Sequence, residues 1–307
     1  MTSTAQISVI IPTVGRASLR TAVESALKQT MRPMEVIVVV DSDCEPDVPR
    51  AAEVRVLRTS GQVGPGRARQ LGIDSAKGEI IALLDDDDRW HEDKLEKQVA
   101  AAPQSERWIL SCRYVRRANG RKPLIIPERL IGSHERVAPY LMKLCSMRRA
   151  RPSLAVPTLV FPKTVADAVP LSASAGSIHD DPMWLMKVQR ALPDVSILQI
   201  PECLVEVNVT ACSTSRPGVD RSQDYIDWGV RELADESRRV RGDYMLYSPI
   251  SSALEVGSIC GVFRSVVAAL RWGRPGIWAW IYASVAALRI GLRHARSGIS
   301  MSARRTQ

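Results

Sequence analysis

Apolar residues occur in short uninterrupted runs in the first third of the chain, and amphipathic segments separate these runs. The runs predict buried β-strands at Ile7–Ile11, Met34–Val40, Val54–Leu57, Glu79–Leu84 and Trp108–Val115. Apolar residues at helical spacing predict helices at Ser18–Thr30, Gly66–Ala76 and His91–Ala102. Uniformly apolar strands that alternate with amphipathic helices are typical of a parallel sheet covered on both faces. We therefore expect an α/β fold.

The pattern becomes looser from about residue 116, where prolines and basic residues separate shorter segments. A strand at Pro157–Phe161, a helix at Pro182–Arg190 and a strand region at Ile197–Val209 indicate an α+β half. Further on, the sequence predicts a helix over residues 222–241 and apolar helix over 248–296, interrupted at 271–276. We expect a first half at residues 1–105, a second half of the same domain at 106–221 and a helical C-terminal extension at 222–307.

Charge is distributed unevenly along the 307 residues. A hydrophobic content of 45% with 24% charged residues is typical of a globular protein. Residues 1–237 carry 31 basic and 31 acidic residues, whereas residues 238–307 carry 11 arginines and only 2 acidic residues. The whole net charge of +9 therefore lies in the last segment, and we expect that segment to meet an anionic partner.

The C-terminal helices combine this charge with apolar surface. Ile277–Leu288 is uncharged and contains three aromatic residues, but its 12 residues fall short of the ~20 that span a bilayer. Arginines flank it, and Ala253–Leu270 is a similar apolar helix broken by Arg264. This pattern favours helices lying on an anionic membrane surface. Packing as a hairpin on the catalytic domain and formation of a homodimer remain alternatives. We do not expect nucleic-acid binding, because the basic excess accompanies an apolar helix.

The cysteines bear on location. All six are scattered, without a CxxC pair or metal-ligand spacing, and no signal peptide precedes the first strand. We expect reduced cysteines in a cytoplasmic protein that is peripheral on the cytoplasmic face of the membrane.

Four consecutive carboxylates, Asp85–Asp88, follow the apolar run that ends at Leu84. Like charges so close together repel one another, but a divalent cation and a phosphate group would neutralise them. Open α/β sheets bind ligands at the carboxyl edge of their strands, where these residues are expected. A solvated acidic turn is the alternative interpretation.

Five segments resemble, in order and spacing, the nucleotide-binding half of glycosyltransferase family 2, the inverting sugar transferases with a GT-A fold. They are Ile7–Thr13, Glu35–Asp41, Gly64–Gln70, Lys77–Asp88 and Arg89–Gln98. The resemblance is close over residues 7–102 and looser to about 215. It implies a GT-A fold: a mostly parallel nucleotide-binding sheet with helices on both faces, followed by an α+β acceptor half.

The resemblance also implies the donor site. Donor-binding roles fall on Pro12, Thr13, Arg16, Asp41, Arg69, Asp85 and Asp86. Asp41 would accept the imide N–H of a uracil or thymine ring, although an Asp at the end of a strand also bonds its own turn. Arg69 would face the donor phosphates or hold the Asp cluster. Asp87 is implied as the ligand of Mn²⁺ or Mg²⁺, with the register among the four Asp residues open by one position.

The family supplies its general base from an acidic pair at the start of a helix in the second half. Asp180 and Asp181 are similar to that pair, with Asp in place of Glu. The resemblance implies that Asp181 is the base and that like-charge coupling to Asp180 raises its pKa. A favourable helix N-terminus is the alternative explanation of the two residues.

Two features depart from the family pattern. Gln70 replaces the usual Asn, and Val205–Val209 stands where an aromatic–basic–His segment is expected, so the acceptor loop is not identified. A P-loop NTPase is excluded because no Walker A motif occurs. A sugar nucleotidyltransferase and an inactive membrane-associated scaffold remain alternatives.

The expected function is metal-assisted, inverting transfer of a sugar from a nucleotide sugar, with UDP or dTDP favoured, to a hydroxyl of a glycan or lipid-linked glycan.

Overall fold

The computed structural model describes residues 6–118, 120–148, 150–171, 178–209 and 218–304, and side chains as far as residue 295. Its contacts divide the chain into two compact units. The first comprises residues 1–137 and 150–211, and the second comprises residues 138–149 and 212–307. The second unit therefore includes a short segment taken from the middle of the sequence.

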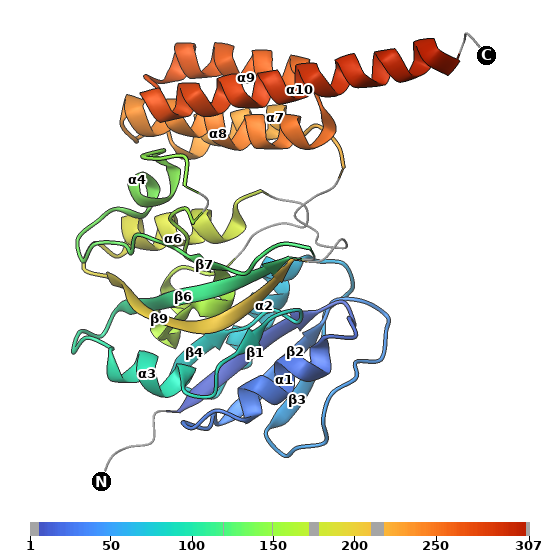
Figure 1. The fold of residues 1–307 in the computed structure, drawn as a ribbon. Coiled ribbons are helices and arrows are strands. Elements are labelled where there is room, and N and C mark those ends of the chain that lie inside the picture. Colours follow the sequence, from blue (N-terminus) through green and yellow to red (C-terminus); the bar gives the residue numbers. More distant parts are fainter. Residues whose placement is uncertain (1–5, 119, 149, 172–177, 210–217, 305–307) are drawn as a thin grey trace. The chain divides into compact units, whose positions relative to one another are not determined.

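A sheet with strand order β3-β2-β1-β4-β8-β6-β9-β5 forms the centre of the first unit (Figure 1). Its first four strands are parallel: β1 (Ile7–Thr13), β2 (Glu35–Val40), β3 (Val54–Arg58) and β4 (Ile80–Leu83). All residues of β1 and β2 are buried, because helices cover both faces of this part of the sheet. The parallel, uniformly apolar strands predicted here are confirmed.

Helices connect these strands. They are α1 (Leu19–Leu27), α2 (Pro65–Asp74) and α3 (Lys94–Ala100). The start of α2 is set by Gly64, whose φ of 90° suits a residue without a Cβ, and by Pro65 at the first helical position. Helices α1 and α3 are several residues shorter than their apolar periodicity predicts, whereas α2 is one residue shorter.

The remaining strands are β5 (Arg89–Trp90), β6 (Trp108–Ala118), β7 (Leu124–Ile126), β8 (Val160–Pro162) and β9 (Ser196–Val209). Strand β8 pairs antiparallel with both β4 and β6, whereas β6 and β9 are parallel. Strand β6 therefore runs in the same direction as β4, as expected for a mostly parallel sheet, but the antiparallel strand β8 lies between them. The short elements η1 (Val156–Thr158), α5 (Lys163–Ala168) and α6 (Asp180–Ala191) complete this half.

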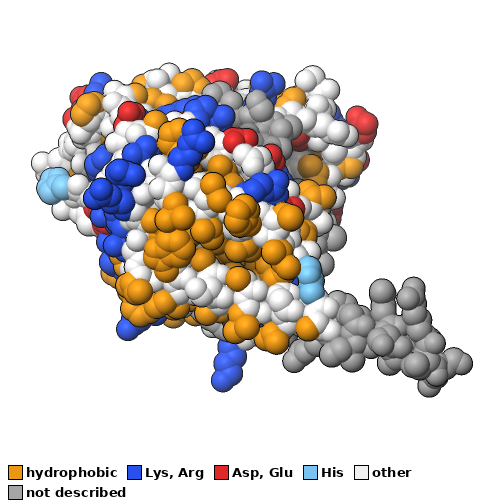
Figure 2. Space-filling model, turned by 90° about the horizontal axis from the view of Figure 1, so that it is seen from above, with side chains coloured by type: hydrophobic (Ala, Val, Ile, Leu, Met, Phe, Trp, Pro, Cys, Tyr) orange, Lys and Arg blue, Asp and Glu red, His pale blue; other side chains and the backbone are white. Residues whose placement is uncertain are grey.

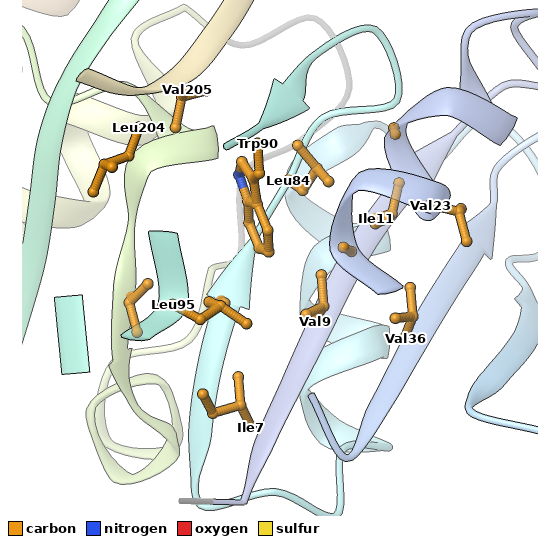
Figure 3. Packing of buried hydrophobic residues seen from close by; sticks show 14 of the residues in the cluster. Ile7, Val9, Ile11, Val23, Val36, Leu84, Trp90, Leu95, Leu204 and Val205 are labelled. Carbon is orange, nitrogen blue, oxygen red and sulfur yellow. The ribbon is translucent and has the colours of Figure 1, made fainter. Parts of the chain in front are cut away.

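Trp90 connects the two halves of the core. Figure 3 shows its ring among buried side chains that include Leu84, Leu95 and Val205. Its indole N–H donates to the Pro157 carbonyl at 2.8 Å. Trp90 pairs with Val205 between β5 and β9, and α3 begins only at Lys94. Cross-strand pairing thus replaces the first turn of the helix predicted at His91–Ala102.

The second unit is helical. It contains α4 (Val137–Met142), α7 (Ser222–Glu232), α8 (Arg238–Val256), α9 (Ile259–Trp272) and α10 (Ile277–Arg304). The interruption predicted at residues 271–276 is confirmed. The single helix predicted over residues 222–241 is wrong, because α7 ends at Glu232 and Ser237 caps α8 by accepting from the Val240 N–H.

A second break, at Gly257–Ser258, replaces the interruption expected at Arg264. Gly257 adopts a left-handed conformation with φ of 75° at the end of α8, and Ser258 caps α9 by accepting from the Gly261 N–H at 3.0 Å. Arg264 lies inside the continuous helix α9. Among the described residues, none of the helices is both long and apolar enough to cross a bilayer.

Buried Asp243 organises the turn between α9 and α10. Its carboxylate accepts from the Gly276 N–H at 2.7 Å, from the Leu144 N–H at 3.0 Å and from Arg239 Nε at 2.8 Å. The negative charge of Asp243 is therefore compensated by partners within the second unit.

Candidate active site

The order of the parallel strands locates the first candidate residues. The chain proceeds from β1 outward through β2 to β3 and then returns to place β4 on the opposite side of β1. In open α/β sheets this reversal leaves a ligand-binding crevice at the carboxyl ends of the two strands concerned. Thr13 ends β1 and the Asp85–Asp88 tetrad follows β4, so both lie at that crevice. Pro12 lies within buried β1 and contributes no polar side-chain group.

Asp86 ties the two strand ends together. Its buried carboxylate accepts from Thr13 Oγ1 at 2.6 Å and from the Arg16 guanidinium. Arg16 also lies 3.5 Å from the Asp87 carboxylate. The proposed donor residues of the first strand and of the tetrad therefore lie together, as the sequence predicts.

Ionisation of Asp87 and Asp88 is unfavourable in this fold. The Asp87 side chain is 19% exposed, and burial, followed by the neighbouring Asp85 carboxylate, raises its pKa above the ordinary value. Burial, again followed by repulsion from Asp85, raises the pKa of Asp88 to about 9. The Asp88 carboxylate accepts from the Asn208 N–H at 2.9 Å.

Asn208, at the end of β9, is a site residue that sequence reasoning missed. Besides its backbone bond to Asp88, its side-chain amide donates to the Asp87 carbonyl at 2.8 Å. These contacts join residues about 120 positions apart. Their only signal in the sequence is the placement of Val205–Val209 where the family has its acceptor segment.

Asp41 lies at the same sheet edge, where its N–H donates to the Thr13 carbonyl at 2.8 Å. Its carboxylate accepts from Thr59 Oγ1 at 2.5 Å, from the Val63 N–H at 2.9 Å and from the Gly64 N–H at 2.8 Å. Asp41 thus fixes the loop that leads into α2. An ionised carboxylate has about four acceptor positions, so one remains for a ligand N–H.

Arg69 joins the tetrad to the second half of the unit. This buried guanidinium donates to Asp85 at 2.6 Å and lies 3.5 Å from the Asp181 carboxylate. Its Nε has no hydrogen-bond partner among the described residues. The bond to Asp85 fits the expected role of holding the Asp cluster, and the expected role toward the donor phosphates stays a prediction.

Asp180 and Asp181 form the first turn of α6, as the sequence predicts. Burial raises the pKa of Asp181 to about 6, against the opposing charge of Arg69. The Asp181 side chain keeps 36% of its surface open, so protein atoms crowd the carboxylate while it remains reachable. His179, just before α6, has φ of 55°. Burial lowers the pKa of His179 to about 4, which keeps its ring neutral at pH 7.

A pocket with about 440 Å³ of empty space, counting the part open to solvent, adjoins Asp181. Its lining is largely apolar, with Arg69, Asp180, Asp181 and Lys187 as the charged groups. The apolar lining includes Leu83, Val156, Leu159, Pro170, Leu171, Met183 and Trp184. A mostly apolar concavity with a few convergent polar groups is the usual form of a small-molecule site.

The donor set suits a hard cation in part. Within the described part of the chain, no three His, Cys, Asp or Glu side chains are arranged to hold a metal. Mg²⁺, however, is usually held by one or two carboxylates together with waters and substrate phosphates. Asp87, whose carboxylate is partly exposed and carries unfavourable charge, fits that mode.

Residues 8–148 match the model of the family described as Glycosyl transferase family 2. This part of the chain belongs to that family. The chain is 28% identical over 151 residues to the amylovoran biosynthesis glycosyltransferase AmsB of Erwinia amylovora, covering 44% of this chain and 50% of AmsB. It is 39% identical over 88 residues to the succinoglycan biosynthesis protein ExoO of Rhizobium meliloti, covering 26% of this chain and 25% of ExoO. The matches therefore span half or less of these relatives.

Solved structures share the fold of this chain over most of its length. Residues 1–349 of S. aureus TarS superpose with a TM-score of 0.57 at 17% identity, covering 86% of this chain and 81% of that one. A second structure of the same TarS fragment, in complex with UDP-GlcNAc, gives the same TM-score at 16% identity. The predicted α/β class and GT-A fold are confirmed.

Proposed function

We propose that the chain is an inverting glycosyltransferase that moves a sugar from a nucleoside diphosphate sugar to an acceptor hydroxyl. The observation that carries this proposal is the position of Arg69, whose guanidinium lies between Asp85 of the tetrad and Asp181 of α6. It brings the carboxylates of the donor crevice and the candidate base to one place, beside an open pocket. Displacement at a sugar carbon requires these two groups on neighbouring parts of one site.

The donor would bind at the carboxyl ends of β1, β2 and β4. Asp41 has an acceptor position for the imide N–H of uracil or thymine, which favours UDP or dTDP. Arg16 and Arg69 supply positive charge near the diphosphate. The TarS complex with UDP-GlcNAc supports a donor of this class, because the two proteins share the fold.

Asp181 is proposed to accept the proton of the acceptor hydroxyl. As that proton leaves, the acceptor oxygen forms a bond to the anomeric carbon, and the bond from this carbon to the diphosphate oxygen breaks. The electron pair of the broken bond leaves with the nucleoside diphosphate. One such displacement inverts the configuration of the sugar carbon. With a pKa of about 6, Asp181 is ionised at neutral pH yet more basic than an ordinary aspartate.

We propose that Asp87, together with the donor diphosphate, holds Mn²⁺ or Mg²⁺. The cation would offset the negative charge that develops on the departing diphosphate. Asp86 is proposed to contact the ribose, because Thr13 and Arg16 occupy one acceptor position on each of its oxygens and leave others for a hydroxyl.

The acceptor is proposed to be a glycan or a lipid-linked glycan. AmsB and ExoO are named for the biosynthesis of amylovoran and succinoglycan, which supports a role in polysaccharide assembly. The apolar pocket next to Asp181 would hold a sugar face against Trp184 and Met183, leaving the reacting hydroxyl at the carboxylate.

The test measures binding and hydrolysis of a panel of nucleotide sugars by the wild type, Asp87→Asn and Asp181→Asn, each with and without Mn²⁺ or Mg²⁺. We expect metal-dependent binding of a UDP- or dTDP-sugar that Asp87→Asn loses. Asp181→Asn should bind the donor normally but turn over about 10²- to 10⁴-fold more slowly.

Asp194→Asn provides a matched control, since Asp194 is an exposed carboxylate that pairs with Arg107, and both residues lie just before the amino ends of β9 and β6. It should change neither binding nor turnover. If no nucleotide sugar binds with either metal, or if Asp181→Asn turns over like the wild type, the proposal is wrong.

A further inference from the structure

Helix α9 exposes its large apolar side chains. Ile259, Phe263, Val267 and Leu270 recur at spacings of four, four and three residues, so they form one stripe along the helix. Each is between 47% and 69% exposed. The buried side of the same helix carries mainly small residues, namely Gly261, Val262, Ser265, Ala268 and Ala269. This distribution is the reverse of a helix whose apolar side faces a core.

Helix α10 repeats the arrangement. Ile277, Ile281, Leu288 and Leu292 lie on one stripe and are between 36% and 66% exposed. Its buried positions are Ala279, Ala283, Ala286 and Ile290. Helices α9 and α10 together contain ten of the seventeen exposed large hydrophobic residues in the described part of the chain. Figure 2 shows hydrophobic side chains gathered on one face, with Lys and Arg side chains beside them.

These residues and the tryptophans beside them, Trp272 and Trp278, are named here the α9–α10 face. Monomeric water-exposed surfaces rarely gather so many large apolar side chains in one place, so the face marks a contact with another apolar phase. The small residues on the buried side show that the large ones are not needed for packing inside the unit.

The charged residues next to the α9–α10 face indicate which kind of partner covers it. Arg271, Arg274 and Arg289 are exposed and form no ion pair with any described residue. In residues 238–307 the acidic residues are Asp243, which is buried and bonded within the unit, and Glu255. A surface that combines apolar stripes with uncompensated arginines is complementary to an apolar phase with anionic head groups.

We propose that the α9–α10 face lies in the interfacial layer of an anionic lipid membrane, with both helices parallel to the membrane plane. The apolar stripes enter the boundary between head groups and acyl chains, and Arg271, Arg274 and Arg289 contact lipid phosphates. The tryptophans suit the same depth, because their rings are apolar and their N–H groups donate to polar neighbours. This inference is independent of the proposed catalytic function, and binding is measured without turnover.

A second copy of the chain fits the same face less well. A symmetric dimer through it would bring two sets of uncompensated arginines close together in a partly desolvated interface, where like charges are costly. A lipid surface supplies the opposite charge instead.

The test is sedimentation of the full chain with vesicles of phosphatidylcholine alone or mixed with phosphatidylglycerol, at low and at high ionic strength. We expect the wild type to pellet with the anionic vesicles and to be partly released at high salt. The double variant Phe263→Ser/Leu288→Ser should bind at least about tenfold more weakly. The triple variant Arg271→Gln/Arg274→Gln/Arg289→Gln should lose roughly a hundredfold in partitioning onto anionic vesicles.

The control is Met34→Ser/Ile125→Ser, which removes two exposed apolar side chains of the first unit and should bind as the wild type does. Circular dichroism verifies that each variant is folded, and light scattering measures its molar mass. The proposal is overturned if the wild type does not pellet with anionic vesicles, or if it binds neutral vesicles equally well. It is also overturned if the Phe263→Ser/Leu288→Ser variant converts a dimer into a monomer without weakening vesicle binding.

Discussion

Two buried cations in the first unit show how differently a charged residue can be accommodated. The Arg69 guanidinium has carboxylates on both sides, and it connects two segments of the candidate site. The Lys94 ammonium is fully buried, has no hydrogen-bond partner among the described residues and lies 4.1 Å from the centre of the Trp90 ring. The charge of Arg69 is compensated by Asp85 and Asp181, both residues of the candidate site. The charge of Lys94 has no such partner among the described residues and is therefore unfavourable.

Asp181 should set the acidic limb of the pH profile. A general base works when it is deprotonated, so its activity is lost as the pH falls through its pKa of about 6. We expect kcat/KM to fall by about tenfold per pH unit below that value. The pH–rate profile of the wild type measures this limb, and Asp181→Asn should lack it in its residual activity. An activity that stays flat down to the ordinary Asp pKa of 3.8 would contradict the assignment.

Replacing Lys94 by Met should stabilise the protein. Burial lowers the pKa of Lys94 from 10.5 to about 7. Between these values the unfolded chain holds one more proton than the folded chain, so the wild type gains stability as the pH rises across that range. Lys94→Met removes the buried ammonium and should raise the free energy of unfolding at neutral pH by about 1–3 kcal/mol.

Urea denaturation at a series of pH values measures the effect of Lys94→Met. The variant should lack the wild-type rise in stability above neutral pH. Lys97→Met is the control, because Lys97 is exposed and pairs with Asp93 one turn away. Its effect should stay within about 0.5 kcal/mol. Equal effects of the two substitutions would show that burial of Lys94 is not the cause.

At the scale of elements, Glu35 fastens the amino ends of the parallel strands. Its buried carboxylate at the start of β2 accepts from Ser8 Oγ of β1 at 2.8 Å, from the Lys77 N–H ahead of β4 at 2.7 Å and from the Arg55 guanidinium of β3. One side chain therefore fixes the ends of four neighbouring strands, at the sheet edge opposite the crevice.

Glu35→Gln should destabilise the first unit by about 1–3 kcal/mol. The NH₂ group of the new amide would face one of the three groups that now donate to Glu35, so that hydrogen bond would be lost. Burial alone would raise the pKa of Glu35, but the hydrogen bonds from Lys77, Ser8 and Arg55 hold it below the usual 4.5. The stabilisation from Glu35 is therefore present above pH 4.5 and is lost as the pH falls through the folded-state pKa. Urea midpoints of wild type and variant should converge at low pH, and a constant difference would refute this account.

The sequence predicts the elements best where one local pattern decides them. Uninterrupted β-branched runs identify β1 and β2, and both are buried throughout. The failures come from contacts distant in sequence. Arg89–Trp90 forms a strand because β9 pairs with it, and the α8–α9 break depends on the left-handed Gly257. Asn208 reaches the tetrad only because β9 folds back beside β5.

At the scale of the whole chain, the carboxylates of the candidate site and the excess of arginines belong to different units. The first unit contains the carboxylates that strand order brings to one crevice, and the parallel order could be anticipated from the alternation of strands and helices. The position of Arg69 between Asp85 and Asp181 could not, since no local pattern relates residues more than a hundred positions apart. The second unit contains the arginine excess, and only the structure shows which sides of its helices are exposed.

The raised pKa of Asp87 has a consequence for how this protein evolves. A carboxylate that folding makes harder to ionise lowers the stability of the native state at neutral pH, so Asp87→Asn is expected to melt at a higher temperature than the wild type. Selection for thermal robustness alone would then remove the residue proposed to hold the metal. In this chain Asp87 would then be kept for the function of its carboxylate, at a cost in stability.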